Sequence, residues 1–302
     1  MNKTKIPELS YNAMFKAVFS NHKNVLSKMI EAILSYCNFH VDLKDKELLI
    51  RNNELPLEHF KDRQLICDYI IKLNDNIDLN IEINKSYYPG LIERNMTYSF
   101  KIYYEHFKSG DDYQEFNKYN LLQVNFNHYP NPNGKTINQY FMLDVEDLSN
   151  YLSKNLRIVN IDIASCFHLV YNNSKLDEIS SLERFSACLY CKYLEDISSI
   201  LGSDLLDMEE KQEFLDGIKK ISEDKELLKA VKLEDSIDYR FELVREEAEQ
   251  RGVKQGIAQG IEQGILKTIQ SMLKNNIDIK TISKVTNKSI DEIKEIEQSM
   301  KD

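Results

Sequence analysis

The stretch that most constrains this chain runs from residue 65 to residue 85 and predicts two short β-strands joined by a tight turn. Its two segments, ICDYIIKL and DLNIEIN, are rich in β-branched residues and alternate in polarity. The cluster between them, residues 74–76, reads NDN and favours a turn. A three-residue turn would close an antiparallel hairpin in which Asp68 faces Glu82 and Ile66 faces Asn84.

The hairpin predicts a polar face that carries two carboxylates. Side chains alternate across a strand, so Asp68, Glu82 and Asn84 are expected on one face. The opposite face is apolar and suits a core: Cys67, Tyr69, Ile71, Leu79, Ile81 and Ile83. Facing carboxylates are unfavourable unless a cation lies between them, and Mg²⁺ suits that place because it takes oxygen ligands and binds phosphate oxygens beside carboxylates. The other interpretation is a polar face in contact with solvent.

The D…E-x-N pattern of this hairpin resembles the metal site of the PD-(D/E)XK nuclease superfamily. Further segments resemble its recombination-promoting nuclease/transposase (Rpn-type) branch, in the order of that branch: YNAMFKAVFSNHKNVLSKMIEAIL, the IEIN strand, ERNMTYSFKIYYEHFKSGDDY, and a glycine-phased helix near the C-terminus. The resemblance implies an endonuclease that hydrolyses DNA phosphodiesters with Mg²⁺ or Mn²⁺. It also implies a link to recombination, mobile elements or defence against foreign DNA.

The resemblance assigns roles to five neighbouring residues. Asp68 and Glu82 would hold the metal, with the Ile83 carbonyl as a further ligand. The third motif position normally carries a lysine that stabilises developing negative charge, and in this branch it is commonly glutamine. Here it is Asn84, while Lys85 beside it should point to the opposite face by alternation. Asp68, Glu82, Asn84 and Lys85 are therefore the catalytic candidates. A slow nuclease, one assisted by a nearby cation and a degenerate copy that only binds nucleic acid or assembles all remain open.

A helix is predicted over residues 91–108, between a Pro-Gly pair and a Ser-Gly pair. Arg94 and Tyr98 lie one turn apart on it, and the resemblance places such residues beside the active strand, which makes both candidates for substrate binding. Arg94 is also the second cation, with Lys85, that could assist catalysis. Two interpretations of Arg94 stay open: contact with a phosphate or a site carboxylate, or pairing with Glu93 or Glu105. For Tyr98 the competing interpretation is packing.

The remaining pattern predicts an α/β protein. Helices are expected over 13–19 and 23–37, three more strands in LLQVNFNHY, INQYFMLDV and RIVNIDIA, and helical segments after them. This order gives a mixed sheet flanked by helices, in agreement with the restriction-endonuclease-like core that the resemblance implies. We expect that core over residues 1–170, a helical subdomain over 171–240, and a long helix with a small helical tail over 241–302.

The long helix carries glycine at every fourth position: Gly252, Gly256, Gly260 and Gly264, each followed by an aliphatic residue. Each interior glycine costs a helix about 1 kcal/mol relative to alanine, so an isolated helix with four of them is unfavourable. A second helix packed closely on this face would offset the loss. We therefore expect self-association into a homo-oligomer, or docking within the chain, through residues 245–270. The alternative is a tolerated repeat.

Composition sets the remaining expectations. The net charge of −10 argues against a general DNA-coating protein, because phosphate affinity rests on lysine and arginine. Any DNA-binding cations would have to gather around the cleft. The chain lacks an apolar run long enough for a membrane span and an N-terminal signal pattern, and its five cysteines have no framework spacing. These features favour reduced thiols and a cytoplasmic location.

The end of the chain predicts two short helices around a TNK turn, with Ser289 and Glu292 as a capping box for the second. Their size is similar to a helix-turn-helix, whose second helix would enter the major groove of DNA. This second helix is acidic, however, which disfavours contact with phosphates. Nucleotide-binding glycine motifs and paired histidines are missing from the sequence, so the hairpin remains the main candidate for chemistry.

Overall fold

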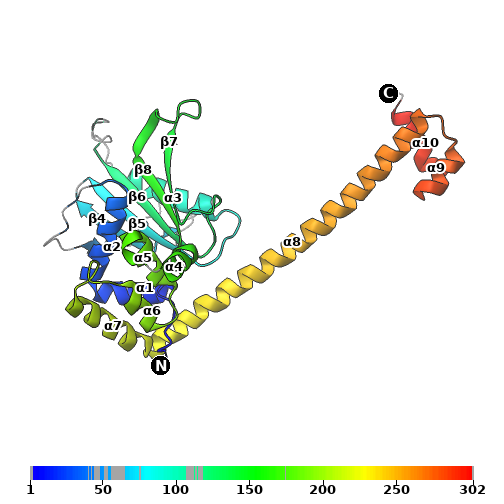
Figure 1. Ribbon diagram of the computed structural model, residues 1–302. Helices are drawn as coiled ribbons and strands as arrows, with labels where there is room; N and C mark the ends of the chain where they lie inside the picture. Colours follow the sequence, from blue (N-terminus) through cyan, green and yellow to red (C-terminus); the bar gives the residue numbers. More distant parts are fainter. Residues whose placement is uncertain are drawn as a thin grey trace. The chain divides into compact units, whose positions relative to one another are not determined.

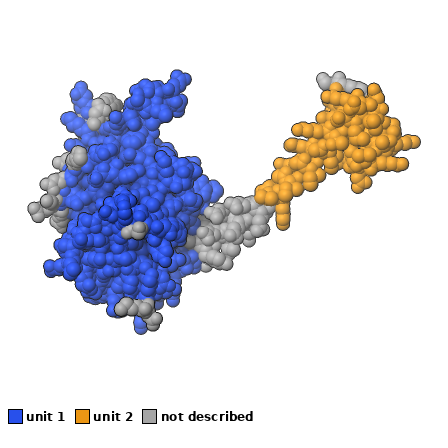
Figure 2. All heavy atoms as spheres, viewed as in Figure 1, with its two compact units in different colours: residues 1–239 blue, residues 240–302 orange. Residues whose placement is uncertain are grey.

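The computed structural model describes residues 3–39, 41, 43, 48–50, 54–55, 65–74, 76–106, 112, 114, 118–173 and 175–300. By its internal contacts the chain divides into two compact units, residues 1–239 and residues 240–302 (Figure 2). Among the described helices, none combines the length and the apolar character that a membrane span requires.

A mixed sheet forms the centre of the first unit (Figure 1). The described strands lie in the order β1 (Leu49–Ile50), β4 (Tyr69–Asn74), β5 (Ile77–Asn84), β6 (Asn120–Asn127), β8 (Tyr151–Asp162) and β7 (Ile137–Leu143). β5, β6 and β8 run parallel, whereas β4 and β7 are antiparallel to their neighbours. β2 (Glu54–Leu55) and β3 (Leu65–Ile66) form a separate antiparallel pair. The α/β fold class is confirmed.

Helices cover both faces of this sheet. One face shares the main hydrophobic core with α1 (Asn12–Asn21), α2 (Lys23–Tyr36), α4 (Ile163–Asn172), η2 (Leu176–Glu178), α5 (Ser181–Tyr190), α6 (Leu194–Ile200) and α7 (Met208–Ser222). The other face packs against α3 (Leu91–Glu105), where a second core contains Ile70, Tyr98, Ile102 and Leu121. The helices expected as a separate subdomain over 171–240 thus lie in the first unit, and α5, α6 and α7 contribute to its main core.

The predicted hairpin register is confirmed along the paired part of β4 and β5. Tyr69 faces Ile81, as the predicted register requires, and both side chains enter the main core. Next to the turn the register shifts, so that Asn74 faces Ile77. A small irregularity near a turn leaves the side-chain alternation of β5 intact, and the two faces of that strand therefore stay as the sequence predicts.

The hairpin prediction was wrong at its open end. Ile66 belongs to β3 and faces Glu54, not Asn84. The chain bends at Asp68, and this bend divides the predicted strand into β3 and β4. Because of this break, Cys67 packs in the core beneath α3 instead of the main core that was expected for it.

Three other boundaries differ from the sequence prediction. β8 ends at Asp162, whose carboxylate accepts a hydrogen bond from the Ser165 N–H at 2.9 Å and caps α4, a helix that the sequence analysis missed. Residues 54–55 form β2, a short strand that the sequence pattern did not predict. The helix expected to reach residue 108 is described as far as Glu105, and its expected end lies outside the described residues.

The second unit contains the C-terminal part of α8 (Lys225–Lys274), followed by α9 (Ile279–Thr286) and α10 (Ile290–Ser299). Ile269, Ile282 and Ile293 are fully buried between these three helices. The capping box that was predicted for the last helix, Ser289 with Glu292, is confirmed.

Candidate metal and active site

The polar face of β5 is buried, because α3 covers this side of the sheet (Figure 1). Asn80, Glu82 and Asn84 expose 0%, 2% and 3% of their surface. The interpretation of this face as solvated is therefore wrong. A carboxylate that leaves water is unfavourable unless hydrogen bonds or a cation compensate it, so the partners of Glu82 decide what this face can do.

Asp68 and Glu82 lie together, as the hairpin predicts. The backbone N–H of Asp68 donates to Glu82 Oε1 at 3.2 Å, and the backbone N–H of Ile83 donates to Asp68 Oδ2 at 2.8 Å. Asn12, the first residue of α1, donates from Nδ2 to Asp68 Oδ1. Burial raises the pKa of both carboxyl groups, and the charge of Asp68 raises that of Glu82 further. The fold thus holds two carboxylates side by side in a place that favours a cation.

The available donors fit a hard divalent cation. The two carboxylates and the Ile83 carbonyl offer oxygen atoms only, which suits Mg²⁺ or Mn²⁺. The buried Oδ1 of Asn12, beside Asp68, has no hydrogen-bond partner in the described part of the protein. Nowhere in that part do three or more His, Cys, Asp or Glu residues gather so that they could hold a metal ion. A cation at this pair would therefore keep several water ligands, as Mg²⁺ commonly does.

Arg94 brings a positive charge to this pair from the first turns of α3. Its Nη2 lies 2.9 Å from Asn84 Oδ1 and 3.6 Å from Glu82 Oε2. Asn95 Oδ1 accepts hydrogen bonds from both Nε and Nη2 of Arg94 and fixes the guanidinium. Of the two interpretations of Arg94, the structure contains the contact with a site carboxylate, Glu82. Tyr98 is 7% exposed, packs in the core beneath α3, and lies with its ring 5.4 Å from the guanidinium.

The two remaining catalytic candidates lie on opposite faces of the sheet. Asn84 donates from Nδ2 to Asn127 Oδ1 at 2.9 Å, so both ends of its amide are hydrogen-bonded. Lys85 lies 2.8 Å from a carboxylate oxygen of Glu8 and 3.9 Å from the ring centre of Tyr11. Alternation predicted this separation, and the structure does not bring Lys85 to the carboxylate pair.

Sequence reasoning missed a buried row of amides next to Glu82. Asn80 donates to Gln123 at 2.7 Å, Gln123 donates to Asn125 at 2.8 Å, and Asn125 donates to Asn160 at 2.8 Å. The available signal was the QVNFN segment of β6, which places a polar amide at every second position up to Asn127. These hydrogen bonds link the side chains in a dry environment and hold the polar face rigid, although Asn80 Oδ1 and Asn127 Nδ2 have no hydrogen-bond partner in the described part of the protein.

The start of α8 also supports the site. The Glu234 carboxylate accepts hydrogen bonds from the backbone N–H groups of Asn12 and Ala13, at 2.8 Å and 2.9 Å. It thereby caps α1, whose own N-cap side chain makes no capping hydrogen bond. Because Asn12 holds Asp68, a residue distant in sequence helps to position the carboxylate pair.

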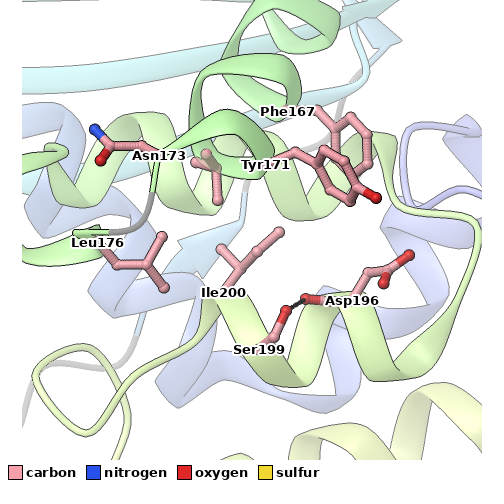
Figure 3. A pocket seen from close by; sticks show the side chains of 8 residues that line it. Phe167, Tyr171, Asn173, Leu176, Asp196, Ser199 and Ile200 are labelled. Carbon is pink, nitrogen blue, oxygen red and sulfur yellow. Dashed lines mark hydrogen bonds between the residues drawn. The ribbon is translucent and has the colours of Figure 1, made fainter.

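A separate cavity of about 270 Å³ lies between α4 and α6 (Figure 3). Mostly apolar side chains line it, including Phe167, Val170, Tyr171, Leu176 and Ile200. Asp68, Glu82 and Arg94 are not among its lining residues. This cavity is therefore separate from the carboxylate pair.

Comparison with protein-family models finds one that covers both carboxylates and α3. The model of a PD-(D/E)XK nuclease family transposase matches residues 11–190. The matched segment begins just before Asn12 and includes Asp68, Glu82 and Arg94. Neither the curated proteins nor the solved structures contain a match to this chain.

Proposed function

The chain belongs to the PD-(D/E)XK nuclease family transposases, and from this premise we propose that it is a metal-dependent DNA endonuclease of the recombination-promoting type. The observation that supports this most is the pair of half-buried Asp68 and buried Glu82, in which the backbone N–H of Asp68 donates to Glu82 Oε1 at 3.2 Å. Two carboxylates removed from water repel each other, and a divalent cation relieves that repulsion. DNA is the substrate that the family implies.

Asp68, Glu82 and the Ile83 carbonyl would hold Mg²⁺ or Mn²⁺. When bound, such a cation lowers the pKa of a coordinated water and polarises the phosphodiester. The chain contributes preorganisation: the Ile83 N–H and the Asn12 amide fix Asp68, and the Asp68 N–H fixes Glu82. Both carboxylates are therefore oriented before the substrate arrives, which limits reorganisation during the reaction.

Arg94 supplies the positive charge that Asn84 lacks. An asparagine amide is neutral, whereas a guanidinium stays charged at any physiological pH. The Arg94 side chain is 30% exposed and lies within 3.6 Å of Glu82, so it can reach a phosphate beside the carboxylates. Asn84 and Asn95 orient the guanidinium through hydrogen bonds, and Tyr98 supports it from below. We assign Arg94 to substrate binding and to stabilisation of negative charge on the phosphate.

Nicking of supercoiled plasmid DNA in Mg²⁺ or Mn²⁺ tests this function. Asp68→Asn and Glu82→Gln keep the shapes of the side chains but remove the charges, and each should reduce nicking by about 100-fold or more. Asp78→Asn is a matched control, because Asp78 is a buried carboxylate on the same face of β5 that accepts a hydrogen bond from Tyr119 instead. EDTA should abolish activity. Folded wild-type protein that is inert with both metals would contradict the proposal.

A second candidate function is a nucleic-acid-binding or assembly protein without catalysis. The contacts of two residues favour it: the Asn84 amide is hydrogen-bonded at both its nitrogen and its oxygen, and Lys85 is paired with Glu8 on the other face. In that case wild type and the two charge-removed variants would be equally inert, and association through α8 would carry the function.

We also propose that copies of the chain associate through residues 245–270 of α8. A Cβ atom built at Gly252, Gly256, Gly260 or Gly264 meets nothing within 4 Å. Three aliphatic side chains beside them, Val253, Ile257 and Ile261, are 61%, 58% and 59% exposed. A second helix would cover this apolar surface and approach closely along the glycines.

A further inference from the structure

The loops after β5 and β6 bring tyrosines together at one edge of the sheet. Tyr87 and Tyr88 follow β5, and Tyr129 follows β6. Because β5 and β6 are parallel neighbours, both loops leave the same edge, the place where α/β sheets commonly bind ligands. The rings of Tyr87 and Tyr129 meet edge to face, with 5.3 Å between centroids and 68° between planes.

Two tyrosines of this region are exposed, whereas Tyr88 and Tyr129 are half-buried. Tyr87 exposes 41% of its surface, and Tyr140 on β7 exposes 42%. In an edge-to-face pair, one ring contacts the other with its edge and therefore covers only one ring face. The remaining ring faces are not used by this contact. Burial, the largest cause, and the phenols of Tyr87, Tyr88 and Tyr140 together raise the pKa of Tyr129 to about 12, against a lowering by Arg94. Tyr140 faces Ile158 of β8, and its hydroxyl accepts a hydrogen bond from Asn138 Nδ2 at 3.3 Å.

The tyrosines adjoin the carboxylate site through Arg94. The Arg94 guanidinium lies 5.7 Å from the ring centre of Tyr88, and the same group contacts Asn84 at 2.9 Å and Glu82 at 3.6 Å. A strand of nucleic acid with one phosphate at Arg94 would therefore carry its neighbouring bases past exposed aromatic rings.

The charge of the chain favours base contacts over phosphate contacts. With a net charge of −10, the protein has little general attraction for a polyanion. Aromatic rings bind unpaired bases by stacking on their faces, which duplex DNA keeps hidden between neighbouring base pairs. A tyrosine-rich edge beside Arg94 thus fits an unpaired strand better than the outside of a duplex.

We propose that Tyr87, Tyr129 and Tyr140 form a stacking shelf for unpaired bases of a single-stranded segment of the nucleic-acid substrate. The shelf lies beside Arg94 and would hold bases next to the phosphate that faces Asp68 and Glu82. It deepens the proposed nuclease function by naming the form of the substrate, but binding at the shelf does not require cleavage.

Binding of labelled oligothymidylate in EDTA, where hydrolysis is prevented, tests the shelf. Tyr87→Ala and Tyr140→Ala should each weaken binding about 5-fold to 150-fold without changing its salt dependence, since no cation is lost. Tyr87→Phe keeps the ring and should retain most of the affinity. Tyr171→Ala is the control, because Tyr171 is a 72% exposed tyrosine on α4, away from the carboxylate pair, and should bind like wild type.

Three results would overturn the shelf. The first is wild-type protein that does not bind oligothymidylate. The second is alanine variants that bind it as wild type does. The third is alanine variants whose binding to duplex DNA of the same length weakens to the same extent. Plasmid nicking by wild type, measured in parallel, separates this inference from the nuclease proposal. Ring-dependent binding without nicking refutes the nuclease alone, and nicking without ring dependence refutes the shelf alone.

Discussion

Replacing glycines in α8 by alanine distinguishes a glycine repeat that mediates self-association from one that the helix merely tolerates. Alanine should weaken association in the first case and leave it unchanged in the second. Gly256→Ala and Gly260→Ala add methyl groups where nothing lies within 4 Å in a single chain. If the glycines are merely tolerated, each alanine removes about 1 kcal/mol of helix cost, and the double variant should be about 2 kcal/mol more stable with an unchanged oligomeric state.

The outcome differs if a second copy packs on this face. Added methyl groups in a close helix contact cost about 1–3 kcal/mol through overpacking, and a symmetric dimer contains each of them twice. The dissociation constant of the double variant should then rise by at least about tenfold, because tenfold corresponds to about 1.4 kcal/mol. Local helix stability would still increase. The monomeric variant should therefore have a higher melting temperature than the wild-type monomer, although it associates more weakly.

Sedimentation or light scattering across a concentration series measures this association on the full chain, and circular dichroism follows the melting. Lys254→Ala with Glu262→Ala is the matched control. Both side chains are exposed, and at 100° per residue they lie nearly opposite the neighbouring glycines, so this pair also adds two alanines but should leave association unchanged. Self-association that is equally strong in wild type and in the glycine variant, or absent from both, would refute the contact.

Two further expectations concern the first unit. Burial and Lys85 lower the pKa of His128 to about 3, whereas an unfolded chain takes up this proton near pH 6.5. The free energy of unfolding should therefore fall as pH drops below 6.5, with a slope that approaches about 1.4 kcal/mol per unit near pH 5. Urea denaturation at several pH values should find this slope reduced in His128→Gln, and an unchanged slope would contradict it. Arg94→Ala should reduce plasmid nicking about 100-fold, and adding Asn84→Lys should restore part of it by returning a cation to the space that Arg94 leaves. Activity of the double variant no higher than that of the single one would exclude this exchange of charge.

The sequence determined the features that depend on local pattern. Alternation in polarity on both sides of a turn-forming cluster fixed the faces of β5, and so placed Glu82 and Asn84 together and Lys85 opposite them. Side chains alternate along a strand with a period of two residues, so the pairing register is strongly constrained. A slip by one residue would put every apolar side chain on the wrong face. The capping box at Ser289 and Glu292 was likewise visible, since its hydrogen bonds span only three residues.

Only the tertiary structure decided what surrounds these residues. The bend at Asp68 moved Cys67 beneath α3, and the burial of Glu82 follows from a helix that lies after it in the chain. The partners of Arg94 were open in the sequence because a long side chain can reach several carboxylates, and packing selected Glu82. Tyr129 meets Tyr87 because two parallel strands end at one edge. Hydrogen bonds and ring contacts between distant segments form only once the sheet and helices have brought those segments together, so the pattern of any one segment cannot specify them.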